Sequence, residues 1–206
     1  MADVTPFPAP APVGRRALVT GANGQLGREL MRALPEAGFT VTGVDLPEVS
    51  ISNAEQVAAL PWDDIDVVIN AAAWTNVDGA ETPEGRRATW QANSTGPAIL
   101  AREATAHGVT MVHISTEYVF DGTQDVHLED EAPSPLGAYG QSKAGGDAAV
   151  ASTPKHYIVR TSWVVGDGKN FLKTMASLAD QDISPSVVSD QVGRLTFTSD
   201  LARGII

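Results

Sequence analysis

Three glycines spaced three residues apart near the N-terminus constrain this chain more than any other feature. Gly21, Gly24 and Gly27 follow the apolar run 17–19 and open an amphipathic segment over 28–34. The order strand, glycine turn, helix leaves backbone N–H groups free at a helix N-terminus, where a pyrophosphate binds. Incidental glycines in an ordinary turn are the alternative, and the flanking pattern favours a dinucleotide site.

Short apolar runs alternate with helical stretches along the rest of the chain. The expected strands are 16–20, 39–44, 66–70, 110–115 and 156–160, with 187–188 as a weaker sixth. The expected helices are 25–37, 53–60, 83–107, 138–151 and 170–179. Near-continuous aliphatic strands suit burial on both faces. The alternation predicts an α/β fold, a Rossmann-like, doubly wound parallel sheet with right-handed crossovers.

Length and composition set the outer limits of the fold. We expect residues 1–14 to form a Pro-rich leader or linker, and residues 15–206 to form one dinucleotide-binding domain. A net charge of −11 argues against nucleic acid or an anionic membrane as partner. The chain has no cysteine, no apolar run of membrane-spanning length and no basic, apolar signal segment at its start. We therefore expect a cytoplasmic protein.

Histidine spacing gives no metal site. The four histidines show no pattern typical of metal ligands. His113 lies inside a strand pattern, and we expect it to be a hydrogen-bonded core residue.

Polar residues follow four of the predicted strands. Asp45, Asn70 and the segments 115–118 and 160–163 all stand at carboxyl ends. Because ligands of parallel α/β sheets lie outside those ends, we expect a site at this edge.

A tyrosine and a lysine four residues apart provide candidate acid–base groups. Tyr139 and Lys143 would share one helix face. A nearby ammonium should lower the tyrosine pKa from its unperturbed value of about 10. Thr116, at the end of a strand, is favoured over Ser115 as the hydroxyl that orients a substrate carbonyl.

Asp45 indicates which form of the nicotinamide cofactor the chain binds. A carboxylate about 20 residues past the glycine turn can accept hydrogen bonds from adenosine ribose hydroxyls, and it would repel a 2′-phosphate. NAD(H) is therefore favoured, and NADP(H) is possible. A turn-capping aspartate is the alternative.

Six segments together resemble the dTDP-4-dehydrorhamnose reductase family of extended short-chain dehydrogenases/reductases. They are 21–27, 70–78 with Glu81, 115–122, 139–143, 160–163 and, more weakly, 190–193. The resemblance implies Thr116, Tyr139 and Lys143 as catalytic hydroxyl, proton donor and ribose-binding lysine. We expect cofactor contacts from Tyr139 and Lys143, from Asp45, and from the following set: Gly21, Asn23, Gly24, Gln25, Leu26, Ser50, Ile51, Ala72, Ala73 and Trp74. Within this set, the resemblance implies contacts from 24–26 and 72–74.

The resemblance also implies a substrate. Thr116, Glu117 and Trp163 fall where the family contacts its nucleotide sugar, although the family commonly has Asp at the Glu117 position. Family members continue beyond the position of Ile206, so we expect 15–206 to hold the cofactor domain and the start of a substrate region.

The expected reaction is reduction of the C4 ketone of dTDP-4-dehydro-L-rhamnose to dTDP-L-rhamnose. Reduction or epimerisation of another nucleotide 4-ketosugar remains open, as does a cofactor-binding regulatory subunit without catalysis. A homodimer is possible.

Overall fold

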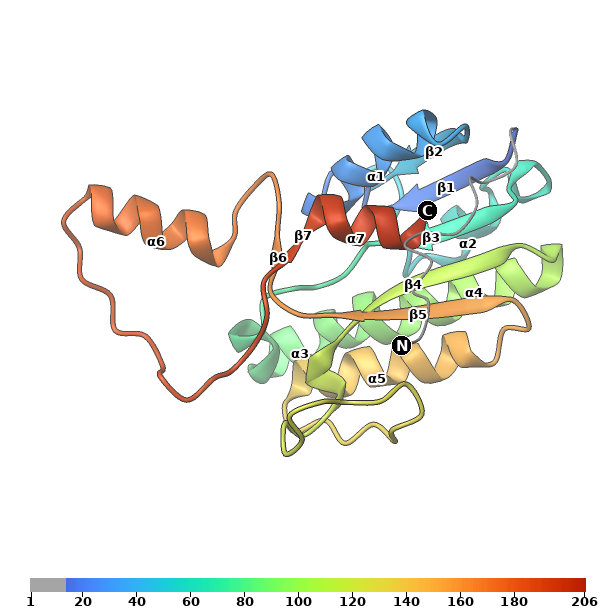
Figure 1. Cartoon of the computed structure of the whole chain (residues 1–206). Helices are drawn as coiled ribbons and strands as arrows, with labels where there is room; N and C mark the ends of the chain where they lie inside the picture. The colour runs from blue at the N-terminus through green and yellow to red at the C-terminus, as the bar shows by residue number, and fades with distance from the viewer. Residues whose placement is uncertain (1–13) are drawn as a thin grey trace, which may run out of the picture.

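The computed structural model describes residues 14–206, and within them a parallel sheet forms the centre of the molecule (Figure 1). Its strands run in the order β2-β1-β3-β4-β5. They are β1 (Arg16–Thr20), β2 (Thr40–Val44), β3 (Val67–Asn70), β4 (Thr110–Thr116) and β5 (His156–Thr161). Every neighbouring pair is parallel, and β1 lies between β2 and β3. The chain therefore changes direction of winding at β1, and the expected doubly wound fold is confirmed. The Pro-rich leader falls almost wholly outside the described residues.

Helices cover both faces of the sheet (Figure 1). The α-helices are α1 (Gln25–Glu36), α2 (Ala54–Ala58), α3 (Pro83–Trp90), α4 (Gly96–His107), α5 (Ala138–Ala151), α6 (Phe171–Asp180) and α7 (Thr198–Ile205). Short turns of other helix types are η1 (Trp62–Asp64), η2 (Asp78–Glu81), η3 (Gln91–Thr95) and η4 (Glu117–Val119). A second, small parallel sheet pairs β6 (Val164–Val165) with β7 (Thr196–Phe197).

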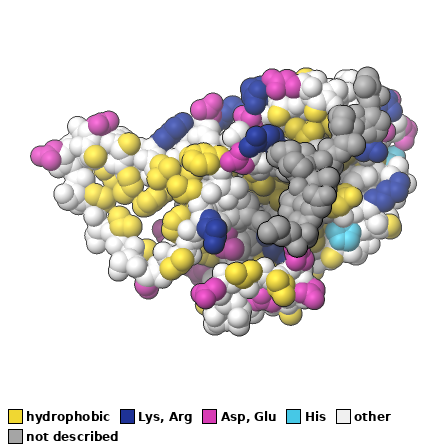
Figure 2. All heavy atoms as spheres, in the orientation of Figure 1, with side chains coloured by type: hydrophobic (Ala, Val, Ile, Leu, Met, Phe, Trp, Pro, Cys, Tyr) yellow, Lys and Arg dark blue, Asp and Glu magenta, His cyan; other side chains and the backbone are white. Residues whose placement is uncertain are grey.

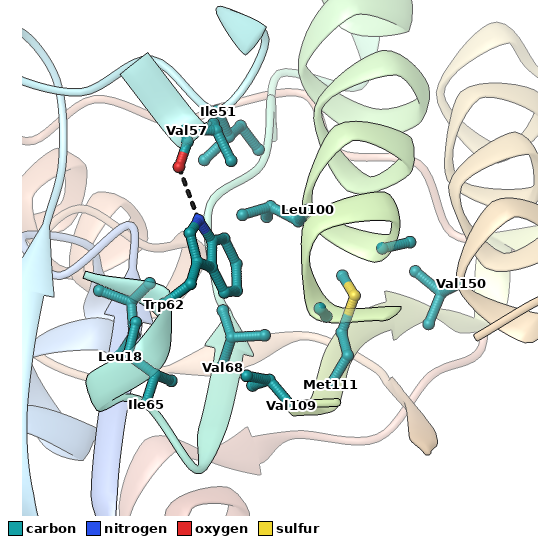
Figure 3. Packing of buried hydrophobic residues seen from close by; sticks show 12 residues of the cluster. Leu18, Ile51, Val57, Trp62, Ile65, Val68, Leu100, Val109, Met111 and Val150 are labelled. Carbon is teal, nitrogen blue, oxygen red and sulfur yellow. Dashed lines mark hydrogen bonds between the residues drawn. The ribbon is translucent and has the colours of Figure 1, made fainter. Parts of the chain in front are cut away.

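Alternation along the strands divides the core between the two faces. Ala17 and Val19 pack with α1 and α7, whereas Leu18 between them packs with α2, α4 and α5. On the latter face Trp62 is almost fully buried, and its indole N–H donates to the Val57 carbonyl oxygen at 2.8 Å (Figure 3). One apolar layer thus packs against each face of the sheet.

Several details differ from the sequence expectation. The single helix expected over 83–107 contains a π-helical turn, η3, between α3 and α4. The weak strand at 187–188 is wrong, because that segment is irregular, and β6, β7 and α7 were not foreseen. Burial on both faces holds for the central strands only: β2 lies at an edge with exposed residues. A strand at the edge of a sheet has a neighbouring strand on one side only, so an apolar sequence there does not show that the strand is buried.

The segment around α6 stands away from the sheet (Figure 1). Residues 171–197 expose many large apolar side chains, which Figure 2 shows gathered at the left of the molecule. They are Phe171, Leu172, Ile183, Val187, Val188, Val192, Leu195 and Phe197. Among the helices of residues 14–206, none combines the length and the apolar character needed to cross a bilayer.

Candidate active site

The glycine turn joins β1 to α1 at the point where the sheet changes its direction of winding. Gly21 has a φ of +70°, and a Cβ there would lie 2.6 Å from the Ala72 backbone nitrogen. A Cβ on Gly27 would lie 2.0 Å from the Gly21 carbonyl oxygen. Only glycine fits either position, because a methyl group would collide with backbone. The turn is therefore packed tightly against the loop that follows β3.

The start of α1 has the features of an anion site. Gly24 is the N-cap and supplies no capping side chain, and the first turn of α1 contains no acidic residue. The first N–H groups of a helix have no intrahelical acceptor and carry partial positive charge. Leu26 is buried in the core, and the Gln25 side chain accepts the Gly166 N–H at 3.1 Å. Their backbone N–H groups remain to receive a pyrophosphate, so this turn fits a dinucleotide.

Asp45 directly follows β2 and braces the same turn. One carboxylate oxygen accepts the Asn23 N–H at 2.8 Å, and the other accepts the Leu46 N–H at 2.8 Å. The turn-capping alternative for Asp45 is thus part of its role. Each oxygen keeps a further lone pair, so ribose hydroxyls are compatible with this arrangement.

Ser50 and Ile51 lie on the segment that leads into α2. The Ser50 N–H donates to Gln56 Oε1 at 2.8 Å, and Ile51 is buried in the core, where a Cβ on Gly96 would meet its side chain at 2.6 Å. The structure thus gives Ile51 a packing role, and the Ser50 hydroxyl lies 3.1 Å from that of Ser52.

The loop after β3 is held by an asparagine that sequence reasoning missed. Asn93, fully buried in the π-helical turn η3, accepts the Trp74 N–H at 2.8 Å and donates to the Trp74 carbonyl oxygen at 3.1 Å. It also donates to Ser142 Oγ at 3.1 Å on α5. Ala72 and Ala73 lie between this anchor and β3. The signal that could have located Asn93 is a polar residue at a buried position of the predicted helix, since π-turns are frequent at functional sites.

The α5 helix carries Tyr139 in its first turn and Lys143 in its second. Glu81, from η2, accepts the Ala138 N–H at 2.7 Å and so caps this helix from outside. A Cβ on Gly140 would lie 2.1 Å from the Tyr118 carbonyl oxygen, and one on Gly146 would lie 2.2 Å from the Asn93 carbonyl oxygen. These glycines let α5 approach η4 and η3 closely.

Tyr139 lies beside Thr116, as expected. Burial and, after it, the Glu117 carboxylate raise the pKa of Tyr139 to about 12, and the interaction with the Thr116 side chain offsets this only in part. Ser115 instead adjoins Asp147. The expected lowering of the Tyr139 pKa by Lys143 is wrong. The Lys143 ammonium points into the sheet, where Nζ donates to the Ile114 carbonyl oxygen at 2.6 Å.

A phenol with a high pKa stays protonated at neutral pH and can act as a proton donor. Lys143 itself is 1% exposed, and burial lowers its pKa to about 8, against an opposing effect of Asp147. The surroundings of the two groups therefore raise the pKa of Tyr139 and lower the pKa of Lys143.

Glu117 and Trp163 follow the carboxyl ends of the neighbouring strands β4 and β5. Glu117 Oε1 accepts the Ser162 hydroxyl at 2.9 Å, and Oε2 is buried without a hydrogen-bond partner among the described residues. Burial raises the Glu117 pKa. Trp163 has a φ of +33°, which is rare for a bulky residue, and its indole lies against the backbone of Gly193. A strained aromatic residue and an unsatisfied carboxylate at one strand edge are typical of a ligand site.

Residues 14–206 contain no group of three or more His, Cys, Asp or Glu side chains that could hold a metal ion. His113 is fully buried and hydrogen-bonded, which confirms the expectation for it.

Comparisons with known proteins agree with this geometry. The family model described as RmlD substrate binding domain matches residues 15–206. A dTDP-4-dehydrorhamnose reductase of Aggregatibacter actinomycetemcomitans is 40% identical over 93% of this chain and 66% of its own length. A probable dTDP-4,6-dihydroxy-2-methyloxan-3-one 4-ketoreductase of Streptomyces antibioticus is 39% identical over 93% of this chain and 66% of its own.

Solved structures point the same way. The crystal structure of dTDP-4-dehydrorhamnose reductase from Bacillus anthracis in complex with NADP has a TM-score of 0.88 and 36% identity, and the match covers 94% of this chain and 69% of that one. The chain spans about two thirds of the length of the relatives it matches.

Proposed function

Because the chain belongs to the RmlD substrate-binding-domain family, we propose that it serves the nicotinamide-dependent reduction of a nucleotide 4-ketosugar. The substrate we propose is dTDP-4-dehydro-L-rhamnose, whose C4 ketone becomes the alcohol of dTDP-L-rhamnose. The observation that carries the proposal is the position of Tyr139. It lies beside Thr116, one turn before a buried Lys143, at the sheet edge that also holds the glycine turn.

Each group of the trio has a distinct task in this reaction. A reduced nicotinamide, when bound, supplies the hydride. The Tyr139 hydroxyl donates its proton to the developing C4 alkoxide, and its raised pKa keeps that proton in place until it is needed. The Thr116 hydroxyl stabilises the same oxygen as negative charge forms. Lys143 would hold the nicotinamide ribose through N–H donors that the Ile114 carbonyl does not use.

The cofactor-binding surface follows from the tightly packed turn. Backbone N–H groups of Gln25 and Leu26 would hold the pyrophosphate beside Gly24, whose own N–H donates to the Gly21 carbonyl oxygen at 3.0 Å. The loop 72–74 would cover the cofactor from the side of β3. We propose NAD(H) as the preferred form because the Asp45 carboxylate would repel a 2′-phosphate. The Bacillus anthracis relative was solved with NADP, so NADP(H) is the competing form.

The substrate side would be built from the residues that follow β4 and β5. Glu117 Oε2, buried and unpaired, would accept a sugar hydroxyl, and Trp163 would pack on the sugar or base. We propose that residues 162–206 begin the substrate region, since α6 within it has an apolar surface and no buried residue.

The Streptomyces relative favours a second candidate. Its name describes a 4-ketoreductase for a different dTDP sugar, so reduction of another dTDP-linked 4-ketohexose is the nearest alternative.

The experiment compares two phenol variants in a cofactor-oxidation assay. Tyr139→Phe should lower turnover of dTDP-4-ketohexoses by about 10²–10⁴-fold, the usual worth of a positioned general acid. Affinity for NADH, measured by fluorescence titration, should stay within a few-fold. Tyr157→Phe is the matched control, because Tyr157 is 66% exposed on β5 and should behave as wild type. Full turnover in Tyr139→Phe would contradict the proposal, and cofactor binding without turnover on any ketosugar would favour a regulatory subunit instead.

A further inference from the structure

A buried polar cluster lies under the catalytic trio, and the proposed reaction uses only one of its members. It joins Asn70 at the end of β3, His113 within β4, and Lys143 and Asp147 on α5. Each of these residues is at most 3% exposed. Buried groups of this kind are costly unless they are mutually satisfied, so their arrangement carries information.

The orientation of Asn70 is fixed by its donors. The Ala72 N–H, which can only donate, points at Asn70 Oδ1 at 3.2 Å, and the Thr20 hydroxyl points at the same oxygen at 2.7 Å. The amide nitrogen Nδ2 therefore faces His113, 3.0 Å from Nδ1. An amide NH₂ can only donate, so Nδ1 must accept. Neutral His113 consequently carries its hydrogen on Nε2.

That Nε2–H faces the lysine. Lys143 Nζ lies 3.5 Å from His113 Nε2 and 2.6 Å from the Ile114 carbonyl oxygen. An ammonium and an imidazole N–H both donate, so neither gains from the contact. A neutral amine has a lone pair that the Nε2–H can approach. The tautomer fixed by Asn70 therefore favours the deprotonated form of Lys143.

Asp147 acts in the opposite sense. Its Oδ1 lies 3.7 Å from His113 Nε2, and its Oδ2 lies 3.4 Å from Arg160 Nε on β5. The charged and titratable groups around Lys143 are thus His113 from β4, Asp147 and Tyr139 from α5, Arg160 from β5 behind Asp147, and Glu117 from η4 beyond Tyr139. Of these, the Asp147 carboxylate favours the ammonium.

We propose that His113 is a positioning residue for Lys143: held in the Nε2–H tautomer by Asn70, it directs the ammonium to the Ile114 carbonyl and lowers the proton affinity of the lysine, against Asp147. This inference rests on the proposed function for its consequence in catalysis, but its physical content concerns the chain alone. Burial, followed by the charge of Lys143, holds the pKa of His113 well below its usual value, which agrees with a permanently neutral imidazole.

The first test reads the tautomer directly in the unmodified chain. Nitrogen-15 NMR of the imidazole should show a hydrogen on Nε2 of His113, and no protonation of the ring between pH 5 and pH 8. A hydrogen on Nδ1, or a doubly protonated ring in that range, would overturn the proposal. No variant, ligand or turnover is needed, so loss of the proposed reductase function would leave this result unaffected.

The second test follows the titration of Lys143 by carbon-13 NMR at Cε in two variants. His113→Phe removes the Nε2–H while keeping an aromatic ring, and the pKa of Lys143 should rise. Asp147→Asn removes the opposing charge, and the pKa of Lys143 should fall. Mere loosening of the core would admit water and raise the pKa in both variants. Shifts of the same sign, or an unchanged pKa in His113→Phe, would contradict the proposal.

If the reductase is active, the pH profile offers a third readout. The fall of kcat at high pH should move upward in His113→Phe and downward in Asp147→Asn. An activity loss of the same size at every pH, with no movement of the profile, would mean that His113 acts on structure alone.

Discussion

The close approach of α5 to the π-helical turn η3 makes a sharp prediction at Gly146. An alanine there places its Cβ 2.2 Å from the Asn93 carbonyl oxygen, well under the 3.0 Å that real Cβ atoms respect. The obstacle is backbone, so α5 must move away by roughly 1 Å. Overpacking of this kind costs about 1–3 kcal/mol, whereas alanine gains about 1 kcal/mol over glycine inside a helix. The net result is destabilisation by up to about 2 kcal/mol.

The functional effect of Gly146→Ala should exceed its effect on stability. Displacing α5 strains the Asn93–Ser142 hydrogen bond and shifts Tyr139 relative to Thr116. A misplacement near 1 Å costs on the order of 10²-fold in rate. Urea unfolding and cofactor oxidation measure the two effects. The matched control is Gly204→Ala on α7, where a Cβ meets nothing within 4 Å and stability should rise by about 0.5–1 kcal/mol. A Gly146→Ala variant as stable and active as wild type would refute the packing argument.

Three further predictions concern charges around the site. Lys143 has a pKa of 10.5 when unfolded and about 8 when folded, so between these pH values the folded chain binds fewer protons than the unfolded chain. The free-energy penalty for burying the ammonium therefore shrinks as the pH rises from 8 to 10.5. Lys143→Met should therefore stabilise the chain in urea at pH 7, lose that advantage near pH 10.5, and abolish turnover; equal stabilisation at both pH values would refute this linkage. Glu81→Ala removes the acceptor for the Ala138 N–H and should reduce turnover more than cofactor affinity. Glu81→Gln keeps an acceptor oxygen and should retain most of the activity, whereas equal losses of activity in both variants would mean that the charge of Glu81 matters and not its hydrogen bond to α5. Asp45→Asn keeps the acceptor for the Asn23 N–H but removes the negative charge, so the affinity for NADPH relative to NADH should rise about tenfold, or about 1.4 kcal/mol. Fluorescence titration measures both affinities, and an unchanged ratio would exclude Asp45 from cofactor selection.

Local pattern was sufficient for the elements that carry the site. The expected strand 16–20 and helix 138–151 coincide with β1 and α5, because each combines a strong period with a clear glycine or polar boundary. The glycine spacing also located the turn after β1, where the close backbone contacts of Gly21 and Gly27 leave glycine no substitute.

Other parts depend on contacts between distant segments and left little local signal. The Asn93 side chain meets Trp74 and Ser142, 19 and 49 residues away, so the helical pattern marks at most a polar residue on an apolar face and does not reveal its partners. The pKa of Tyr139 was expected to fall because helix spacing places Lys143 nearby, but spacing does not reveal that the ammonium turns toward Ile114. Likewise, β6 and β7 pair across about 30 residues, so each two-residue strand has meaning only once its partner is known.

The central claim, that Tyr139 and Thr116 serve hydride transfer at a ketone, is tested most directly by isotope. The chain would be supplied with a nicotinamide cofactor deuterated at C4 of the ring and with a dTDP-4-ketohexose, and the sugar would be recovered for NMR. The account predicts deuterium on C4 of the sugar with wild type, and label that appears about 10²–10⁴-fold more slowly with Tyr139→Phe. A cofactor that binds to the wild-type chain yet never delivers deuterium to C4, or delivery at the wild-type rate in Tyr139→Phe, would contradict it.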